Sequence, residues 1–165
     1  MSQRAIRRAG ADDWSGIWPI WHRVVAAGDT YVWPPDSSED DARAGWMLPP
    51  PAVVFVADDA SDGIVGTAVL KPNQLGLGSH VANASFMVDP ARGGLGIGRE
   101  LGLAVIDEAR GLGYTAMQFN AVVSTNARAI ALWQSLGFDV IGAVPGAFRH
   151  AREGDVDLLI MYRSL

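Results

Sequence analysis

A glycine-rich segment between a predicted strand and a predicted helix is the first place where this sequence could do chemistry. It reads Val88-Asp89-Pro90-Ala91-Arg92-Gly93-Gly94-Leu95-Gly96-Ile97-Gly98-Arg99. Glycine lets backbone N–H groups face outward and approach a ligand closely. The unpaired N–H groups at a helix N-terminus, together with the helix dipole, favour an anion, most often a phosphate. The segment is therefore interpreted as a site for a phosphorylated cofactor.

The spacing of these glycines excludes two common phosphate-binding motifs. The sequence has no Gly-Lys-Ser or Gly-Lys-Thr, so the segment is not a Walker A loop. No Gly-x-Gly-x-x-Gly can be drawn through residues 93–102, which disfavours a Rossmann-like oxidoreductase. A purely structural turn between a strand and a helix is the alternative that remains.

Two asparagines form a second group of candidates. Asn83 and Asn120 each fall inside a predicted strand, and asparagine is a poor strand former. A buried amide needs hydrogen-bond partners, so two amides on adjacent strands could jointly hold a polar ligand. The alternative is that each one satisfies the backbone of a local bulge or loop. His80 and His150 are the candidates for taking up a proton, although a surface or hydrogen-bonded histidine is commoner.

The elements that would position these residues follow from apolar spacing and from turn residues. Strands are predicted over residues 3–8, 53–57, 64–70, 80–88, 117–122, 138–144 and 156–162. Helices are predicted after a capping Asp12 or Asp13 until Gly28 stops the helix, after a capping Ser37 or Ser38 to Met47, over 96–112 with Gly113 at the end, and over 126–136 with Gly137 as the terminating residue. Early antiparallel hairpins followed by strand–helix alternation predict an α/β (α+β mixed) fold, with a mixed sheet and helices on both faces.

Composition and charge limit the classes of function. The 165 residues are interpreted as a single domain over residues 1–165, with 49% hydrophobic and 19% charged residues, as in a soluble globular protein. A net charge of −5 disfavours nucleic acid bound through a broad basic surface. The chain has no cysteine, so disulfides, thiolate zinc sites and a cysteine nucleophile are excluded, and no metal is expected. This composition fits a cytoplasmic protein, and no apolar run could span a membrane.

Two motifs resemble the GNAT superfamily of N-acetyltransferases. Gly96 and Gly98, after a strand ending in Val-x-Pro, are similar to the family's acetyl-CoA loop, Arg/Gln-x-x-Gly-x-Gly/Ala. Gly93 takes the Arg/Gln position, and Arg92 stands one residue early. Residues 125–138 resemble the family's Asn-x-x-Ala-x-x-Leu-Tyr-x-x-x-Gly-Phe block, with Asn126 as its asparagine. The resemblance implies a GNAT-like, mostly antiparallel mixed sheet with a splayed central strand pair.

The resemblance also implies an acetyl-CoA-dependent N-acetyltransferase. In that family the cofactor's pantetheine arm inserts between the splayed strands, and the glycine-rich turn holds the diphosphate. The resemblance implies that Met87 and Val88 present backbone groups to the pantetheine and the acetyl carbonyl. The cofactor contacts implied here are Met87, Val88, Arg92, Gly93, Gly94, Leu95, Gly96, Ile97, Gly98, Arg99, Asn126 and Trp133. Trp133 stands where many members have a tyrosine acid, so we expect it to pack against the core or the cofactor. The predicted strand over residues 80–88 lacks the family's glutamate base, which leaves deprotonation through water or by a histidine, His80 or His150.

The acceptor side resembles a fungal branch of this superfamily that acetylates L-azetidine-2-carboxylate and related imino acids. The likeness rests on Asn83, Asn120 and Asn126, and it implies that Asn83 and Asn120 contact the acceptor. Aromatic residues near both ends of the chain are expected to line the acceptor wall, namely Tyr31, Trp33 and Phe148. A small amine, amino acid or imino acid is the favoured acceptor. The alternatives are a protein N-terminus or lysine, and a regulatory module that binds acyl-CoA without catalysis. A homodimer through the terminal strands is left open.

Overall fold

The computed structural model describes residues 4–165 and contains one seven-stranded sheet, in the order β1-β2-β3-β4-β5-β7-β6. Neighbouring strands are antiparallel except β4 and β5, which are parallel. The strands are β1 (Arg4–Arg8), β2 (Val53–Asp59), β3 (Gly63–Pro72), β4 (Val81–Val88), β5 (Ala116–Val123), β6 (Asp139–His150) and β7 (Gly154–Ser164). The predicted mixed, mostly antiparallel sheet is confirmed. Gln3, the predicted start of the first strand, lies outside the described residues.

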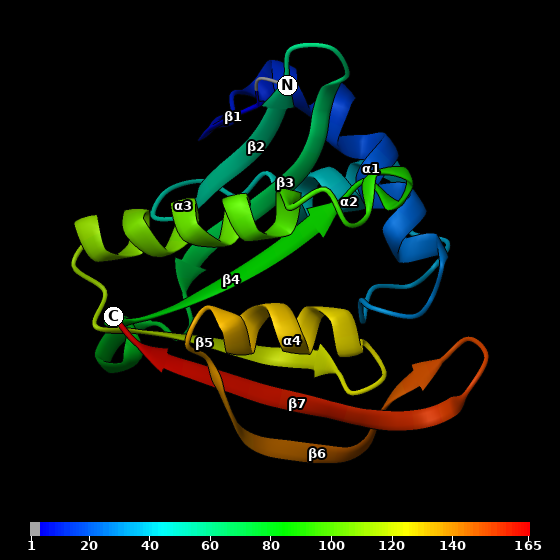
Figure 1. Ribbon diagram of the computed structural model, residues 1–165, viewed down its shortest axis with the longest axis vertical. Coiled ribbons are helices and arrows are strands. Elements are labelled where there is room, and N and C mark those ends of the chain that lie inside the picture. Colours follow the sequence, from blue (N-terminus) through cyan, green and yellow to red (C-terminus); the bar gives the residue numbers. More distant parts are fainter. Residues whose placement is uncertain (1–3) are drawn as a thin grey trace.

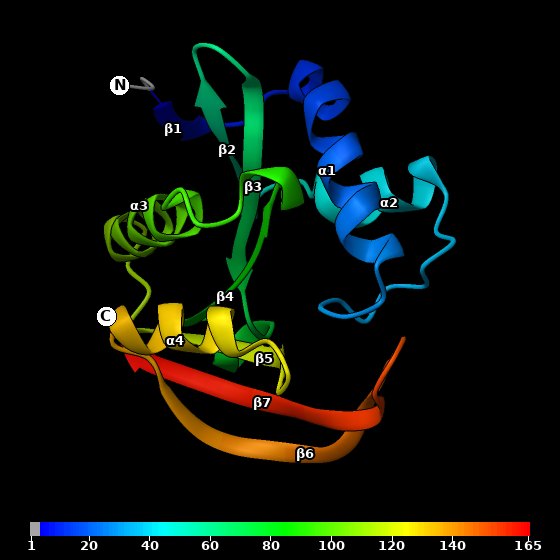
Figure 2. The same cartoon turned by 45° about the vertical axis from the view of Figure 1, so that its right-hand side comes forward.

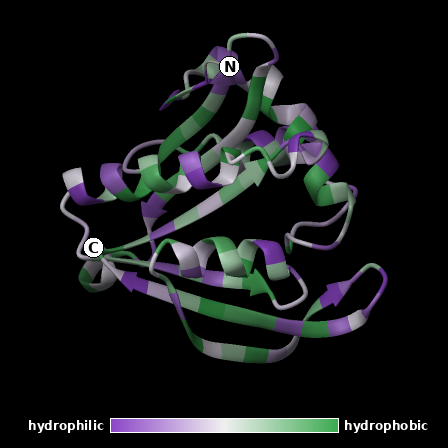
Figure 3. Ribbon diagram, viewed as in Figure 1, coloured by the Kyte–Doolittle hydropathy of each residue, from purple (hydrophilic) through white to green (hydrophobic). Residues whose placement is uncertain are grey.

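Four helices cover the two faces of this sheet (Figures 1 and 2). They are α1 (Trp14–Ala26), α2 (Glu39–Trp46), α3 (Ile97–Gly111) and α4 (Ala127–Ser135). One buried cluster joins α1 and α2 to β2 and β3, and a second joins α3 and α4 to the middle of the sheet. Apolar residues therefore fill both sides of the central strands, as the green β2 and β3 show in Figure 3. Within residues 4–165, no helix has both the length and the apolar character that crossing a membrane requires.

The central feature of the fold is the separation of β4 from β5. These strands pair only at Val81 with Ala116 and at Ala82 with Met117. Beyond these two pairs the strands diverge, as Figure 1 shows between β4 and β5. The expected splayed strand pair is thereby confirmed. Backbone groups on the facing edges no longer bond one another over the rest of their length, so they are free to take other partners.

Two glycines set the position of α3 beside this gap. A Cβ on Gly66 of β3 would lie 2.9 Å from a methyl group of Ile97, and a Cβ on Gly102 of α3 would lie 2.8 Å from Leu136. Real Cβ contacts essentially never come this close, so a side chain at either position would force Ile97 or Leu136 to shift, and glycine lets α3 pack closely against both neighbours. The N-terminus of α3 is consequently held at the wide end of the gap.

The closing strand pair is longer than predicted. Strand β6 was expected to end at Val144, but it continues to His150 through a register shift between Val144 and Phe148. Pro145 and Gly146 were expected to lie in a polar, glycine-containing loop between the last two strands, and proline cannot donate a ladder hydrogen bond. Strand β6 is the last strand of the sheet, and an edge strand tolerates proline at a bulge.

The predicted capping aspartate of α1 has a different role. Asp13 does occupy the N-cap position, but its side chain makes no capping hydrogen bond to the helix. Its carboxylate accepts a hydrogen bond from the Gly10 N–H at 2.7 Å and pairs with Arg7 at 2.8 Å. This ion pair holds the pKa of the Asp13 carboxyl below its ordinary value. Asp13 therefore stands at the predicted N-cap position, but the prediction that it caps the helix was wrong.

Candidate functional site: a cavity between the separated strands

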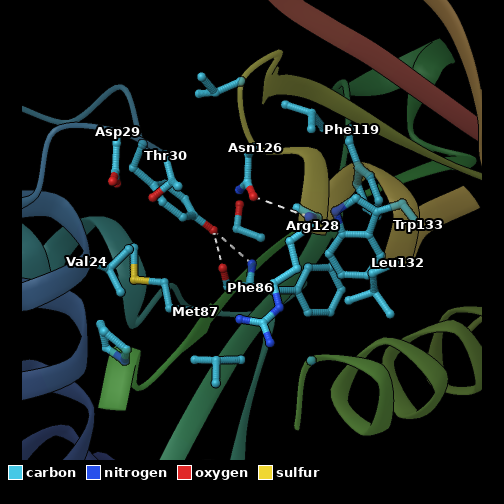
Figure 4. Close-up of a pocket in the computed structure, with 18 of the residues that line it drawn as sticks. Val24, Asp29, Thr30, Phe86, Met87, Phe119, Asn126, Arg128, Leu132 and Trp133 are labelled. Atoms are coloured by element: carbon cyan, nitrogen blue, oxygen red, sulfur yellow. Dashed lines mark hydrogen bonds between the residues drawn. The ribbon is translucent and has the colours of Figure 1, made fainter. Parts of the chain in front are cut away.

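The gap between β4 and β5 opens into a cavity of about 740 Å³, a size typical of small-molecule sites. Its walls come from five places: the end of α1 with the loop after it, the strand β4, the strand β5, the glycine-rich turn with the start of α3, and α4. Figure 4 shows side chains from these elements converging on one space. Elements far apart in the sequence therefore form a single site.

Most of the residues proposed from the sequence line this cavity. They are Tyr31, Trp33, Asn83, Met87, Val88, Arg92, Gly93, Gly94, Gly96, Ile97, Gly98, Asn120, Asn126 and Trp133. Four proposed residues are not part of the lining, namely Leu95, Arg99, Phe148 and His150. Leu95 belongs instead to a smaller depression next to β1 and β2, and its side chain is exposed. The glycine-rich turn and the asparagines thus meet, whereas the end of β6 stays apart.

The glycine-rich turn presents backbone rather than side chains to the cavity. Gly94 and Gly96 have φ angles of +85° and +78°, a left-handed conformation that other residues rarely adopt. Gly96 is also the N-cap of α3, so no side chain caps the first turn of that helix. The N–H groups at the start of α3 thus have no competing side-chain acceptor, as an anion site requires.

The arginines around the turn are placed differently from the expectation. Arg92 pairs with Asp62 at 2.5 Å, and Arg99 donates to the Ser135 hydroxyl at 3.0 Å. Arg128 of α4, which was not among the sequence candidates, places its guanidinium over Gly93 and Gly94. The sequence contained a signal for this position. Arg128 lies two residues after Asn126, and Gly93 stands where the family has Arg or Gln.

Tyr31 holds the edge of β4 that faces the gap. Its hydroxyl donates to the Phe86 carbonyl oxygen at 2.6 Å and accepts from the Phe86 N–H at 2.9 Å (dashed lines at Phe86 in Figure 4). Burial raises the pKa of the Tyr31 hydroxyl above its ordinary value of 10.0, although the hydrogen bond to Phe86 opposes this shift. Tyr31 is therefore a neutral hydrogen-bonding group at neutral pH and not a base.

Backbone alternation along β4 selects which groups can reach a ligand. The backbone groups of Phe86 bond the Tyr31 hydroxyl on the side of the gap, whereas the Asp89 N–H bonds the Val65 carbonyl of β3 at 3.0 Å. The backbone N–H and carbonyl groups of even-numbered residues therefore point into the gap, and those of odd-numbered residues point to β3. The reason is that the hydrogen-bonding sides of successive residues alternate in an antiparallel pair. The backbone of Val88 faces the gap as expected. The backbone of Met87 falls on the β3 side, so the expectation that Met87 presents backbone groups to a cofactor does not fit.

The two candidate asparagines lie on opposite walls of the cavity. Asn83 is 9% exposed and donates from Nδ2 to the Gln118 carbonyl at 3.0 Å, which links β4 to β5 where they separate. Asn120 is exposed, donates to the Asn73 side chain at 2.7 Å and accepts from the Gln118 side chain at 2.9 Å. Asn120 lies at the irregularity in β5 between Phe119 and Val122. Both amides line the cavity and both also have local partners.

Asn126 and Trp133 take up the two ends of the α4 motif. Asn126 lines the cavity and caps α4, because its Oδ1 accepts from the Ala129 N–H at 3.2 Å. The buried Trp133 ring lies 4.6 Å from the Phe86 ring and 4.9 Å from the Phe119 ring, measured between centroids. Trp133 is thus part of an aromatic cluster at the cavity wall. This placement fits the expectation that it packs against the core or a cofactor.

His150 occupies a structural position away from the cavity. It is 6% exposed, and its Nδ1 accepts hydrogen bonds from the backbone N–H groups of Arg152 at 3.1 Å and Glu153 at 3.2 Å. A nitrogen that caps a turn in this way is not free to take a proton from a substrate. Phe148 is also buried, with its ring 6.3 Å from the His150 ring. His80, the other histidine considered, is exposed.

The hairpin that His150 shapes touches the loop after α1. The Ala151 N–H donates to the Gly28 carbonyl at 3.0 Å, and Arg152 reaches Asp29 at 3.5 Å. Asp29 is the one carboxylate among the described cavity-lining residues. The same loop carries Trp33, whose ring packs edge-on against Trp21 and lies directly over Gly45. The loop after α1, which lines one side of the cavity, is therefore supported by both α2 and the β6–β7 hairpin.

Comparison with known proteins assigns the family. The model of the acetyltransferase (GNAT) family matches residues 17–138. N-acetyltransferase aca1 of Schizosaccharomyces pombe is 35% identical over 113 residues, 68% of this chain and 54% of that protein. The chain therefore spans about half the length of this relative. The L-methionine sulfoximine/L-methionine sulfone acetyltransferase of Pseudomonas paraeruginosa is 33% identical over 151 residues, 86% of this chain and 83% of that protein.

Solved structures agree with this assignment. A GCN5-related N-acetyltransferase from Kribbella flavida superposes with a TM-score of 0.94 at 47% identity, covering 98% of both chains. The structure of yncA from Salmonella typhimurium, solved with its cofactor acetyl-CoA, has a TM-score of 0.82 at 29% identity and covers 99% of this chain and 95% of that one. The chain therefore belongs to the acetyltransferase (GNAT) family of acetyl-CoA-dependent N-acetyltransferases.

Proposed function

We propose that this chain transfers the acetyl group of acetyl-CoA to the amine of a small amino or imino acid. The observation that carries the proposal is the cavity itself. It joins an uncapped helix N-terminus at one end to a pair of amides, Asn83 and Asn120, at the other. A phosphorylated donor and a polar acceptor can therefore meet in the gap between β4 and β5.

The residues of the donor end suit acetyl-CoA, which supplies the acetyl group as a reactive thioester. The left-handed turn at Gly94 and Gly96 gives N–H donors for the diphosphate. The gap-facing backbone of Val88 offers strand-like hydrogen bonds to the amides of the pantetheine arm. Asn126 at the start of α4 lies beside the same path, and the buried Trp133 gives it an apolar wall.

On the protein's side, catalysis is mainly positioning. The acceptor nitrogen forms a bond to the acetyl carbon, the carbon–sulfur bond breaks, and the sulfur leaves as coenzyme A. A gap-facing N–H of β4, such as that of Val88, can stabilise the negative charge that develops on the acetyl oxygen. No histidine or glutamate is among the described lining residues, and Asp29 is paired with Arg152. We therefore route the proton lost by the ammonium to water.

Two observations support a small acceptor. The Pseudomonas paraeruginosa relative bears the name of an enzyme acting on methionine sulfoximine and methionine sulfone, which are amino acids of low mass. In this chain the acceptor side is bounded by the aromatic Tyr31 and Trp33 and by the contact between Ala151 and Gly28. Such an enclosed wall suits a small molecule better than an extended polypeptide.

The test is the release of coenzyme A thiol from acetyl-CoA in the presence of a panel of amines. The panel contains azetidine-2-carboxylate, proline, methionine sulfone, amines without a carboxylate, and peptides with a free N-terminus or lysine. Turnover of the small amino or imino acids supports the proposal. Turnover of peptides alone would instead indicate a protein acetyltransferase. Calorimetric binding of acetyl-CoA with no turnover of any amine would indicate a binding module.

A further inference from the structure

We propose that Arg128 of α4 supplies the cation that binds the cofactor diphosphate, replacing a side chain that the glycine-rich turn lacks at Gly93. The inference rests on the proposed use of acetyl-CoA. It adds a residue that belongs to neither the turn nor β4. Figure 4 shows the Arg128 side chain reaching from the start of α4 into the cavity.

The position of the guanidinium is the first observation. A Cβ on Gly93 would lie 2.9 Å from Arg128 Nη1, and a Cβ on Gly94 would lie 2.8 Å from Arg128 Nη2. Both terminal nitrogens thus lie directly above consecutive residues of the turn. A guanidinium presents its donors as a planar fork, which matches two oxygens of a phosphate group.

The charge balance of the cavity is the second observation. Three arginines line the cavity, and two of them have carboxylate partners: Arg23 pairs with Asp89 at 3.2 Å and Arg92 with Asp62 at 2.5 Å. Within residues 4–165, the structure gives Arg128 neither a hydrogen bond nor an ion pair. A guanidinium and the positive end of the α3 dipole repel one another unless an anion lies between them. A diphosphate is the part of the cofactor that would neutralise both.

Gly93 is explained by space and not by backbone conformation. Its φ and ψ of −60° and 140° are open to any residue. Apart from Arg128, the nearest atom to a Cβ there is the Pro90 carbonyl oxygen at 3.8 Å, which is an ordinary contact. Arg128 is therefore the group that a side chain at position 93 would displace. The absence of a side chain at Gly93 thus provides the space that the Arg128 guanidinium occupies.

Calorimetric binding to three probes tests this role: coenzyme A, 3′-dephospho-coenzyme A and pantetheine, which lacks the diphosphate. We expect Arg128→Ala to weaken binding of the first two by about tenfold to a hundredfold, the size of a lost charge-assisted contact, and to leave pantetheine binding unchanged. Arg110→Ala is the control, since Arg110 lies at the far end of α3 and pairs with Asp107. Equal affinities of wild type and Arg128→Ala for coenzyme A would overturn the proposal. A loss of affinity seen with coenzyme A but not with 3′-dephospho-coenzyme A would also overturn it, because Arg128 would then bind the 3′-phosphate.

A second variant separates the proposed contact from damage to the fold. Gly93→Arg in the Arg128→Ala background moves the cation from α4 to the turn, into space that the first substitution has vacated. We expect this double variant to recover most of the affinity for coenzyme A that Arg128→Ala loses, whereas Gly93→Arg alone does not bind more tightly than wild type, because the new side chain collides with Arg128. A double variant as weak as Arg128→Ala would contradict the exchange. Failure of the wild type to bind coenzyme A would remove the proposed function itself, a distinct result.

Discussion

The Tyr31 hydroxyl bonds both backbone groups of Phe86, with its oxygen 2.6 Å from the carbonyl oxygen and 2.9 Å from the amide nitrogen. The two residues are 55 positions apart in the sequence. At this point β5 has moved away, so one hydroxyl takes the place that a neighbouring strand would fill. The open edge of β4 is therefore held by the loop after α1, so the shape of the gap depends on the position of that loop.

Removal of this hydroxyl is expected to weaken the folded state. Tyr31→Phe leaves the Phe86 N–H and carbonyl without their partner in a partly buried site, which costs about 1–3 kcal/mol. Denaturant unfolding measures the change, with Tyr162→Phe on β7, outside the cavity lining, as the control. We also expect slower acetyl transfer, because the gap-facing edge of β4 loses its support. Equal unfolding midpoints for wild type and Tyr31→Phe would show that the contact contributes nothing.

The same hydroxyl predicts how stability depends on alkaline pH. Burial raises the pKa of Tyr31 in the folded protein above the value of about 10 that it has when unfolded. The folded state then holds its proton where the unfolded state has lost it, so this contribution is complete below about pH 10 and declines above it. Unfolding free energies measured between pH 8 and pH 11 are expected to fall more steeply for wild type than for Tyr31→Phe. Parallel curves would place the hydroxyl in contact with water.

Features of the fold that depend on residues close together in the sequence could be predicted from it. Gly113 and Gly137 were predicted to end helices, and they have φ angles of +88° and +87°, the left-handed conformation that follows a helix. The extension of β6 past Pro145 could not be predicted in this way. Whether proline lies in a loop or in a bulged edge strand depends on which strand lies beside it, and the sequence pattern carries no such information.

The site residues also divide into those that a contiguous motif predicts and those that only the packing of distant segments places. The glycine-rich turn and Asn126 were found because each motif is contiguous, and both line the cavity. The position of Arg128 over Gly93 depends on the packing of α4 against the start of α3, between segments that are distant in the sequence. His150 looked suitable as a base by residue type alone, but its Nδ1 is already an acceptor for two backbone N–H groups.

The two asparagines are expected to differ when each is replaced by alanine. Asn120→Ala should raise the KM for the acceptor and leave coenzyme A affinity nearly unchanged, because Asn120 is exposed and both of its partners are side chains, those of Asn73 and Gln118. Asn83→Ala should raise the same KM and also lower stability by about 1 kcal/mol, because it removes the bond to the Gln118 carbonyl. Steady-state kinetics with calorimetry separates the two effects. Equal loss of both affinities in either variant would argue against acceptor contact.

Substitution of His150 distinguishes a turn-forming role from a catalytic one. His150→Ala leaves the N–H groups of Arg152 and Glu153 without their acceptor, so we expect a loss of stability of about 1 kcal/mol and a looser hairpin. The pH dependence of kcat should keep its wild-type form, because no proton transfer passes through the imidazole. His150→Asn is the informative companion, since an asparagine oxygen also accepts from the N–H two residues on. We expect it to restore stability and to keep kcat. A base would behave in the opposite way, with kcat lost in both variants and the pH profile changed, because an amide cannot take up the proton.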